Sequence, residues 1–293
     1  MGRMGTTDGQ AWQPLTPRGV GRFARASVAR LLAAQGVVAL LAAATVTWCV
    51  ATGWFPVIEA AVGRLPNHAL LRSGRLDWPD SSPQWLAEGR CLAVVVDLDH
   101  SGALRGAADV HVELGRGSLR VASLLGYVEW PYPPDWQIAL NRPAALPWWG
   151  AWSPAFLAAV CAATLLGLLV LWTVAATVYC APVWALGFVA NRGLAWGGAW
   201  RLAAAAQLPG ALLLTAALAA YGLGWADPVR VLVAFGLHFG LTWLYLVLSP
   251  LTLPRVATPG HAPRNPFAGA PEQQGRGIPG PPARENPFRA DTP

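Results

Sequence analysis

The chain contains no lysine and few charged residues of any kind. All 21 basic side chains are arginines, 15 side chains are acidic, and charged residues make up 12% of the chain, roughly half the fraction usual in soluble domains. The absence of lysine is typical of a GC-rich genome. The pI is about 9.7, but the arginines are divided among several segments. Without a basic cluster, the composition does not indicate nucleic-acid binding.

Cysteines are few and scattered. The four are Cys49, Cys91, Cys161 and Cys180, and only Cys91 falls outside the long apolar runs. An internal disulfide in the polar segment is therefore excluded. Cys91 could form an intermolecular bridge, but a buried strand thiol is the favoured interpretation.

Acidic and basic residues are missing from four long runs, apart from Arg230 at the border of the last. The runs are Gln35–Trp54, Ser153–Ala190, Leu202–Trp225 and Val231–Leu248. Each is long enough to cross a hydrocarbon core of about 30 Å as a helix. The sequence predicts an α-helical integral membrane protein with four transmembrane helices and a small β-rich extracytoplasmic domain.

These patterns divide the chain into five parts. They are a disordered Arg-rich cytoplasmic leader (1–29), a first transmembrane helix (30–54), an extracytoplasmic β-rich domain (55–152), a three-helix membrane unit (153–250) and a disordered cytoplasmic tail (251–293). The first apolar run is longer than a signal-peptide core, and no cleavage site is evident near Gly53, so we expect an uncleaved anchor. Arg18, Arg22, Arg25 and Arg30 precede it. The positive-inside rule then predicts a multi-pass protein of the cytoplasmic (inner) membrane with both termini cytoplasmic.

The run from Ser153 to Ala190 could form one helix or two elements. One span keeps Arg192, Arg201, Arg255 and Arg264 on the cytoplasmic side, whereas two spans would place them outside. We therefore expect one helix that starts at Ser153-Pro154 and bends or follows the inner interface after Pro182. The next helix should run from Leu202 to about Gly224, interrupted by Pro209, and the last should end at Leu248.

Alternating and continuous apolar patterns predict strands between the first two spans. Cys91–Asp97 reads as the central strand. Asp109–Leu114 and Ser118–Ser123 read as a hairpin with Leu114 opposite Leu119, Val112 opposite Val121 and Glu113 opposite Arg120. An earlier hairpin is expected from Ala69 to Trp78. The proline-rich stretch from Trp130 to Pro147 is expected to be an ordered return to the membrane and not a strand.

Polar side chains gather where the central strand ends. They are Asp97, Asp99, His100 and Ser101. They could hold a metal ion, or His100 could activate Ser101. The favoured interpretation is a turn, because these residue types bond their own backbone.

Asp109, His111 and Glu113 form a second group on one strand face, with a spacing that can bind a divalent ion. A solvated strand face explains them equally well. Neither group has the spacing of a metal signature. We therefore expect no catalytic residue, metal or cofactor.

Four polar residues interrupt the last two apolar runs: Gln207, Thr215, His238 and Thr242. They could line a conducting path. Hydrogen bonding between packed helices is favoured, since alanine- and glycine-rich faces such as Ala203–Ala206 allow close approach.

The tail repeats one short motif, as Asn265-Pro266-Phe267 and Asn286-Pro287-Phe288. An aromatic motif in a disordered tail can dock a cytoplasmic partner. Compositional chance is the alternative.

The layout resembles a family of uncharacterised bacterial four-span membrane proteins, some of which are named for maltodextrin utilisation. The residues that carry the resemblance are Leu65-Pro66 through Gly74-Arg75-Leu76, Cys91–Asp97 with the turn to Gly102, and Trp200 through Pro209. The resemblance spans about residues 30–250. It implies a cytoplasmic-membrane location, an extracytoplasmic β-domain after the first span, and a transport-accessory or envelope role without an assigned activity.

Three functions remain open from the sequence. The leading hypothesis is a non-enzymatic accessory, scaffold or sensing protein of the lipid bilayer, whose extracytoplasmic domain binds a ligand or a protein partner. The second is a small transporter or channel subunit that uses the polar residues of the last two helices. The third is a metal-dependent enzyme at the Asp97–Ser101 segment.

Overall fold

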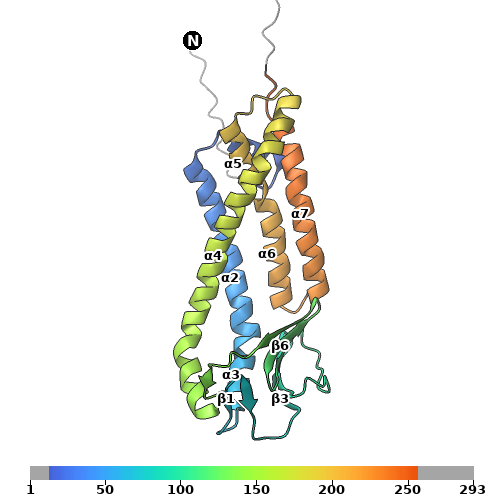
Figure 1. Ribbon diagram of the computed structural model, residues 1–293. Coiled ribbons are helices and arrows are strands. Elements are labelled where there is room, and N and C mark those ends of the chain that lie inside the picture. Colours follow the sequence, from blue (N-terminus) through green and yellow to red (C-terminus); the bar gives the residue numbers. More distant parts are fainter. Residues whose placement is uncertain (1–12, 257–293) are drawn as a thin grey trace, which may run out of the picture. The chain divides into compact units, whose positions relative to one another are not determined.

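The computed structural model describes residues 13–256 (Figure 1). Within these residues, four helical stretches are long and apolar enough to cross a membrane: Val28–Gly63, Arg142–Val189, Trp196–Gly222 and Pro228–Leu251. A small β-sheet domain lies between the first and the second. The predicted class, four apolar helices with a β-rich domain after the first, is confirmed at this level.

The helices are α1 (Pro17–Arg22), the 3₁₀ turn η1 (Phe23–Arg25), α2 (Val28–Gly53), α3 (Phe55–Gly63), α4 (Arg142–Val189), α5 (Trp196–Ala206), α6 (Leu208–Gly222) and α7 (Pro228–Leu251). Helix α2 packs against α4 and α6, α5 packs against α4, and α6 packs against α7. Helix α3 continues the direction of α2 into the predicted β-rich segment.

Helix α4 is one continuous helix, so the single-helix interpretation of this run is confirmed. The predicted start at Ser153 is wrong, because α4 begins at Arg142 and is capped by Asn141, whose Oδ1 accepts a hydrogen bond from the Ala144 amide (3.1 Å). Pro147 and Pro154 lie inside it and each removes a backbone donor. Packing of Trp149 on Phe55 of α3, at 4.9 Å between ring centroids, holds these first turns in place.

The predicted interruption of the third apolar helix is confirmed at Gln207, between α5 and α6. Pro209 cannot donate the hydrogen bond that would continue α5. The third apolar helix begins at Trp196, the first residue of α5, and not at Leu202 as predicted.

The leader was predicted to be disordered through residue 29, and this is wrong for residues 17–25. Thr16 caps α1, and Val20 and Phe23 are fully buried between α5 and the ends of α4 and α7. Burial of these two side chains gives the segment the apolar contacts that an arginine-rich composition alone does not suggest. Residues 1–12 of the leader and 257–293 of the tail lie outside the described residues.

The β-domain (α3 with strands β1–β8, residues 55–138) holds two sheets in the described chain. One has the order β3 (Gln84–Glu88), β4 (Leu92–Val96), β5 (Val110–Leu114), β6 (Ser118–Ser123), β7 (Gly126–Pro131); the other has the order β2 (Arg75–Asp77), β1 (Leu70–Arg72), β8 (Gln137–Ile138). Strands β4 and β5 are parallel, and all other pairs are antiparallel. A parallel pair needs a long connection, here the crossover loop of residues 97–109.

The predicted hairpin register is confirmed, with Leu114 opposite Leu119 and Glu113 opposite Arg120. The earlier hairpin is confirmed as well, and Ser73 and Gly74 have the positive φ angles of its two-residue turn. Strand β4 is buried and paired on both sides, but β5 is the central strand. The stretch from Trp130 to Pro147 is not strand-free, because it holds the end of β7, all of β8 and the first turn of α4.

Helix α3 covers one face of the larger sheet. Val57 and Ala61 of α3, and Leu65 just after it, form a core with buried residues of the larger sheet (Leu86, Leu92 and Val96) and of the smaller sheet. Alternation along the strands sends His111 and Glu113 of β5 to the opposite face. That opposite face carries the polar side chains of the β-domain.

Candidate functional site

Asp97 ends β4 and anchors the crossover loop. Its buried carboxylate accepts hydrogen bonds from Ser101 Oγ and from the Gly102 amide, both at 2.9 Å. Burial alone would raise the pKa of Asp97, but these hydrogen bonds together outweigh it and lower the pKa. Asp97, Ser101 and Gly102 thus form the turn that the sequence favoured.

His100 turns away from its neighbours in the sequence. Its φ of 49° is left-handed, and its ring reaches the strands, with Nδ1 3.2 Å from Glu113 Oε2 and Nε2 3.0 Å from Ser118 Oγ. Gly115 lies directly against the ring, where a Cβ would come within 2.1 Å of Nε2. No local pattern points to Ser118 in this contact, because it lies eighteen residues from His100 in the chain.

Arg120 and Glu129 complete a polar network on β5, β6 and β7. Arg120 lies 3.6 Å from Glu113 Oε2 and 3.2 Å from Glu129 Oε2, and Ser118 Oγ donates to Glu129 Oε1 at 2.6 Å. Two hydrogen bonds lower the pKa of Glu129. The bond from Ser118 has the larger effect, and the bond from Arg120 has the next largest. The network joins three strands to the crossover loop.

Ser118, His100 and Glu113 follow the order of a serine–histidine–acid relay. In such a relay the hydroxyl gives its proton to histidine. The single hydroxyl proton of Ser118 is directed instead to Glu129, and the Ser118 side chain is buried. The bonding pattern therefore supports a structural network and not an activated nucleophile.

The structure does not bring Asp97, Asp99 and His100 together around a common point. Asp99 is exposed and faces Arg116 at 3.6 Å, while the other two bond to the partners given above. Between residues 13 and 256, no group of three or more His, Cys, Asp or Glu side chains is arranged to hold a metal ion. Asp109, His111 and Glu113 likewise have separate surroundings: a tyrosine hydroxyl, the Trp85 ring and His100.

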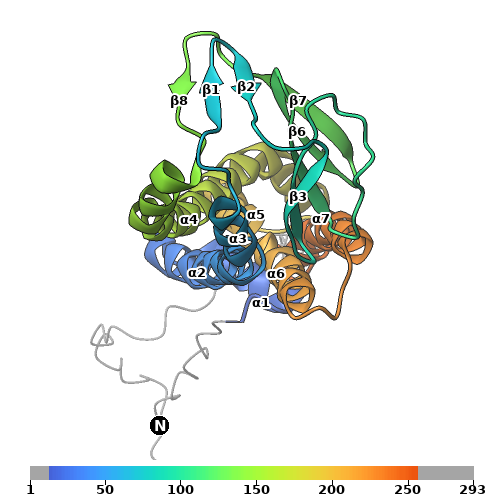
Figure 2. The same cartoon turned by 90° about the horizontal axis from the view of Figure 1, so that it is seen from below.

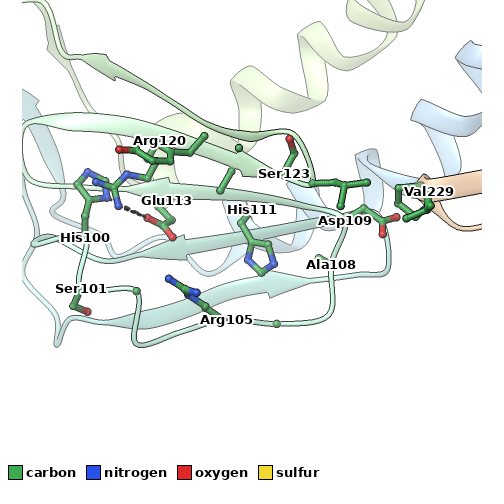
Figure 3. Close-up of a pocket in the computed structure, with 17 residues that line it drawn as sticks. His100, Ser101, Arg105, Ala108, Asp109, His111, Glu113, Arg120, Ser123 and Val229 are labelled. Atoms are coloured by element: carbon green, nitrogen blue, oxygen red, sulfur yellow. Dashed lines mark hydrogen bonds and ion pairs between the residues drawn. The ribbon is translucent and has the colours of Figure 1, made fainter. Parts of the chain in front are cut away.

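A pocket of about 670 Å³ lies over this polar face (Figure 3). Its walls come from the crossover loop, from β5 and β6, and from the start of α7, and they include His100, Arg105, Asp109, His111, Glu113 and Val229. We call it the polar pocket. Figure 3 shows Arg105 and His111 directed toward the same space from opposite walls.

Arg105 and His111 are two polar groups of this pocket that remain available. Arg105 is exposed and makes no hydrogen bond or ion pair with any residue between 13 and 256, and His111 contacts the Trp85 ring, with the centroids 6.4 Å apart. Sequence reasoning missed Arg105, because an arginine in a glycine- and alanine-rich loop has no distinguishing pattern. The available signal was the length of this loop, because a parallel strand pair requires a long connection between its strands.

The β-domain is attached to α6 through Tyr221. The Tyr221 hydroxyl donates to Asp109 Oδ2 at 2.6 Å, and the Arg90 guanidinium lies 5.0 Å from the Tyr221 ring centroid and bonds to the Tyr221 carbonyl. Asp109 is the residue just before β5. Figure 2 shows one end of the larger sheet beside α7, and Pro228 and Val229 at the start of α7 line the polar pocket.

The polar residues of the apolar helices bond to main-chain carbonyls. Gln207 Nε2 donates to the Trp172 carbonyl of α4 at 3.0 Å, which is an interhelical bond. Thr215 and Thr242 each bond the carbonyl four residues earlier. His238 Nδ1 lies 2.7 Å from the Phe235 carbonyl of its own helix. Of these four residues, only Gln207 makes the interhelical bond that was predicted, and the other three bond within their own helices.

Two predictions from the sequence remain, one for Cys91 and one for the Asn-Pro-Phe motifs. Cys91 is buried, as expected, but it lies one residue before β4 and not within the strand. The two Asn-Pro-Phe motifs lie outside the described residues. Comparisons with protein families, with curated proteins and with solved structures found no match.

Proposed function

We infer that this chain is a multi-pass protein of the cytoplasmic membrane that acts as a non-enzymatic accessory or scaffold protein. Both termini lie in the cytoplasm, and the extracytoplasmic β-domain binds a protein partner. The observation that carries the partner-binding role is the open edge of β7.

Membrane insertion is supported by the surfaces of the apolar helices. Most of their large apolar side chains point outward; Leu166, Val170 and Leu171 of α4, for example, are at least 60% exposed. Exposed apolar surface on this scale is costly in water and favourable in lipid. The orientation is supported by arginines at the helix ends away from the β-domain, among them Arg25, Arg192 and Arg201.

Partner binding is supported by strand β7. It is the last strand of its sheet, and every residue in it is exposed. Tyr127, Val128 and Trp130 are 66%, 53% and 52% exposed. Soluble domains usually shorten, charge or cover such an edge. An uncovered edge with aromatic side chains fits a partner that adds a strand or lays an apolar face against it.

The test is co-purification of the full chain from its native host in gentle detergent, with mass spectrometry of the proteins that co-elute. A protein recovered with the wild type in fixed proportion should be lost from Trp130→Lys. Trp130 is half exposed, so the substitution leaves the sheet itself intact.

Trp136→Lys is the matched control. Trp136 is 47% exposed and lies outside β7. Equal recovery of the partner with both variants would show that β7 is not the binding surface. Recovery of the wild type alone, as a monomer or homo-oligomer, would contradict the accessory role.

A further inference from the structure

The polar pocket adjoins a second, apolar pocket. The second pocket has a volume of about 530 Å³ and lies between β6, the β6–β7 turn and the first turns of α7 beside α6. The two pockets share Asp109, Ser123, Leu124 and Pro228 in their walls. Because they share these four residues, the two pockets adjoin, and we call the pair, with its polar end and its apolar end, the depression.

The apolar pocket is lined by Leu214 and Leu218 of α6 and by Val231, Leu232 and Phe235 of α7. Leu125, at the tip of the β6–β7 turn, also lines it and is 82% exposed. In the proposed orientation this end faces the hydrocarbon of the outer leaflet. A turn that carries two adjacent leucines is suited to rest on the membrane surface.

The formal charges of the polar pocket balance, with Arg105 and Arg120 against Asp109 and Glu113, but the Arg105 guanidinium is paired with neither acid. Both acids are already bonded: Asp109 accepts from the Tyr221 hydroxyl, and Glu113 faces His100 and Arg120. Arg105 has no such partner among residues 13–256, and His111 points toward the same space (Figure 3). Arginine is well suited to phosphate because its planar fork can donate two parallel hydrogen bonds.

We propose that this depression binds one membrane phospholipid. The lipid phosphate lies in the polar pocket against Arg105, with His111 beside it. One acyl chain lies in the apolar pocket against α6 and α7. The proposal rests on membrane insertion as inferred above, but it is independent of the protein partner at β7.

The adjacency of the two pockets distinguishes a phospholipid from other occupants. A soluble phosphate compound would use the polar pocket alone and would leave the apolar pocket uncovered. A hydrocarbon or a partner helix would use the apolar pocket and leave Arg105 unpaired. A phospholipid joins a charged part to an apolar part, as the polar pocket adjoins the apolar pocket at Leu124 and Pro228, which line both.

The test uses the full chain in lipid nanodiscs of phosphatidylglycerol and phosphatidylcholine with a small fraction of a phospholipid carrying a photoreactive group in its acyl chain. After illumination, cross-linked peptides are mapped and quantified by mass spectrometry. In the wild type, cross-links should concentrate on the apolar-pocket segments of α6 and α7. Arg105→Gln should lower that yield roughly tenfold at limiting lipid, since a hydrogen bond to a charged group is lost.

Arg75→Gln is the matched control for charge, because Arg75 is exposed on β2 in the other sheet. For the apolar end, Leu232→Trp should fill the pocket and lower the yield. Leu237→Trp makes the same substitution at an exposed position of α7 outside the pocket and should not. Leu232 is 45% exposed, so neither tryptophan needs space in a packed core.

Three results would overturn the proposal. Cross-links spread evenly over the exposed faces of α2, α4 and α7 would indicate only bulk lipid. Equal yields for Arg105→Gln and Arg75→Gln would show that Arg105 does not bind the lipid phosphate. Complete competition by free glycerol phosphate would indicate a soluble ligand. Alkaline extraction of native membranes, run in parallel, separates the two proposals: release of the protein would contradict membrane insertion itself.

Discussion

Single residues at the ends of strands shape the polar face of the β-domain. Asp97 accepts a hydrogen bond from the Gly102 amide at the beginning of the crossover loop. Because the backbone at His100 is left-handed, its imidazole lies against Glu113 and Ser118. Neighbours in the sequence consequently have different environments, since Asp99 remains exposed beside Arg116. The hydrogen bonds of Asp97 and His100 position the loop that forms one wall of the polar pocket.

Asp97→Asn should reduce stability and remove part of its acid dependence. The folded-state pKa of Asp97 is lowered, so its carboxylate stabilises the fold above its unfolded value of about 3.9, and this contribution is lost as pH falls through the folded value. We expect a loss of about 1 kcal/mol near neutral pH, the difference between charged and neutral hydrogen bonds. Thermal unfolding of the full chain in detergent, followed over a pH series, measures both effects.

Asp99→Asn is the control at the residue scale. The Asp99 side chain is 79% exposed. The Asp99→Asn protein should therefore unfold at the same temperature as the wild type, with the same dependence of that temperature on pH. If Asp97→Asn retained the full loss of stability on acidification, the turn would not depend on the Asp97 charge.

At the scale of elements, α6 and α7 approach each other closely at Gly210. A Cβ at Gly210 would lie 2.6 Å from the His238 carbonyl oxygen and 2.7 Å from Thr242 Oγ1. Small residues allow such close backbone contact between helices in lipid. The contact fixes the two helices that form the floor of the apolar pocket.

Gly210→Ala should therefore destabilise the helix pair by about 1–3 kcal/mol, the usual cost of overpacking. The measurement is the unfolding temperature of the purified protein in detergent. Gly236→Ala is the matched control, because a Cβ at Gly236 meets nothing within 4 Å. It should be neutral or slightly stabilising, since alanine favours helix. A Gly210→Ala protein as stable as Gly236→Ala would refute the close packing.

The elements that could be predicted from sequence are those with a clear pattern. Long runs without charge mark the four apolar helices, and alternation marks the β5–β6 hairpin and determined its register correctly. Strand β7 could not be predicted, because all its residues are exposed and no buried face marks it. Helix α1 was missed because two buried residues, Val20 and Phe23, stabilise it within an arginine-rich segment.

The candidate site could be predicted only in part. The turn at Asp97 follows from local chemistry, since its partners are four and five residues away. The polar pocket depends on contacts between distant segments: the crossover loop, β5 and the start of α7. No local pattern connects Arg105 with Val229, so the pocket becomes visible only once the parallel β4–β5 pair is known.

At the scale of the whole molecule, the account depends on which side of the membrane the β-domain occupies. Both ends of the described chain lie at the same end of the helices, where the Tyr245 hydroxyl donates to the Leu15 carbonyl at 2.6 Å. The β-domain lies at the opposite end (Figure 1). An extracytoplasmic partner at β7 and an outer-leaflet phospholipid both require this orientation.

Cysteine accessibility in intact cells tests this most directly. In a variant with Cys49, Cys91, Cys161 and Cys180 replaced by alanine, Asp80→Cys places a thiol on the exposed surface of the β-domain, and Gln13→Cys places one at the other end. A membrane-impermeant maleimide should label Asp80→Cys in intact cells, and should label Gln13→Cys only after the cells are lysed. Labelling of Gln13→Cys but not Asp80→Cys before lysis would contradict the account, and so would equal labelling of both.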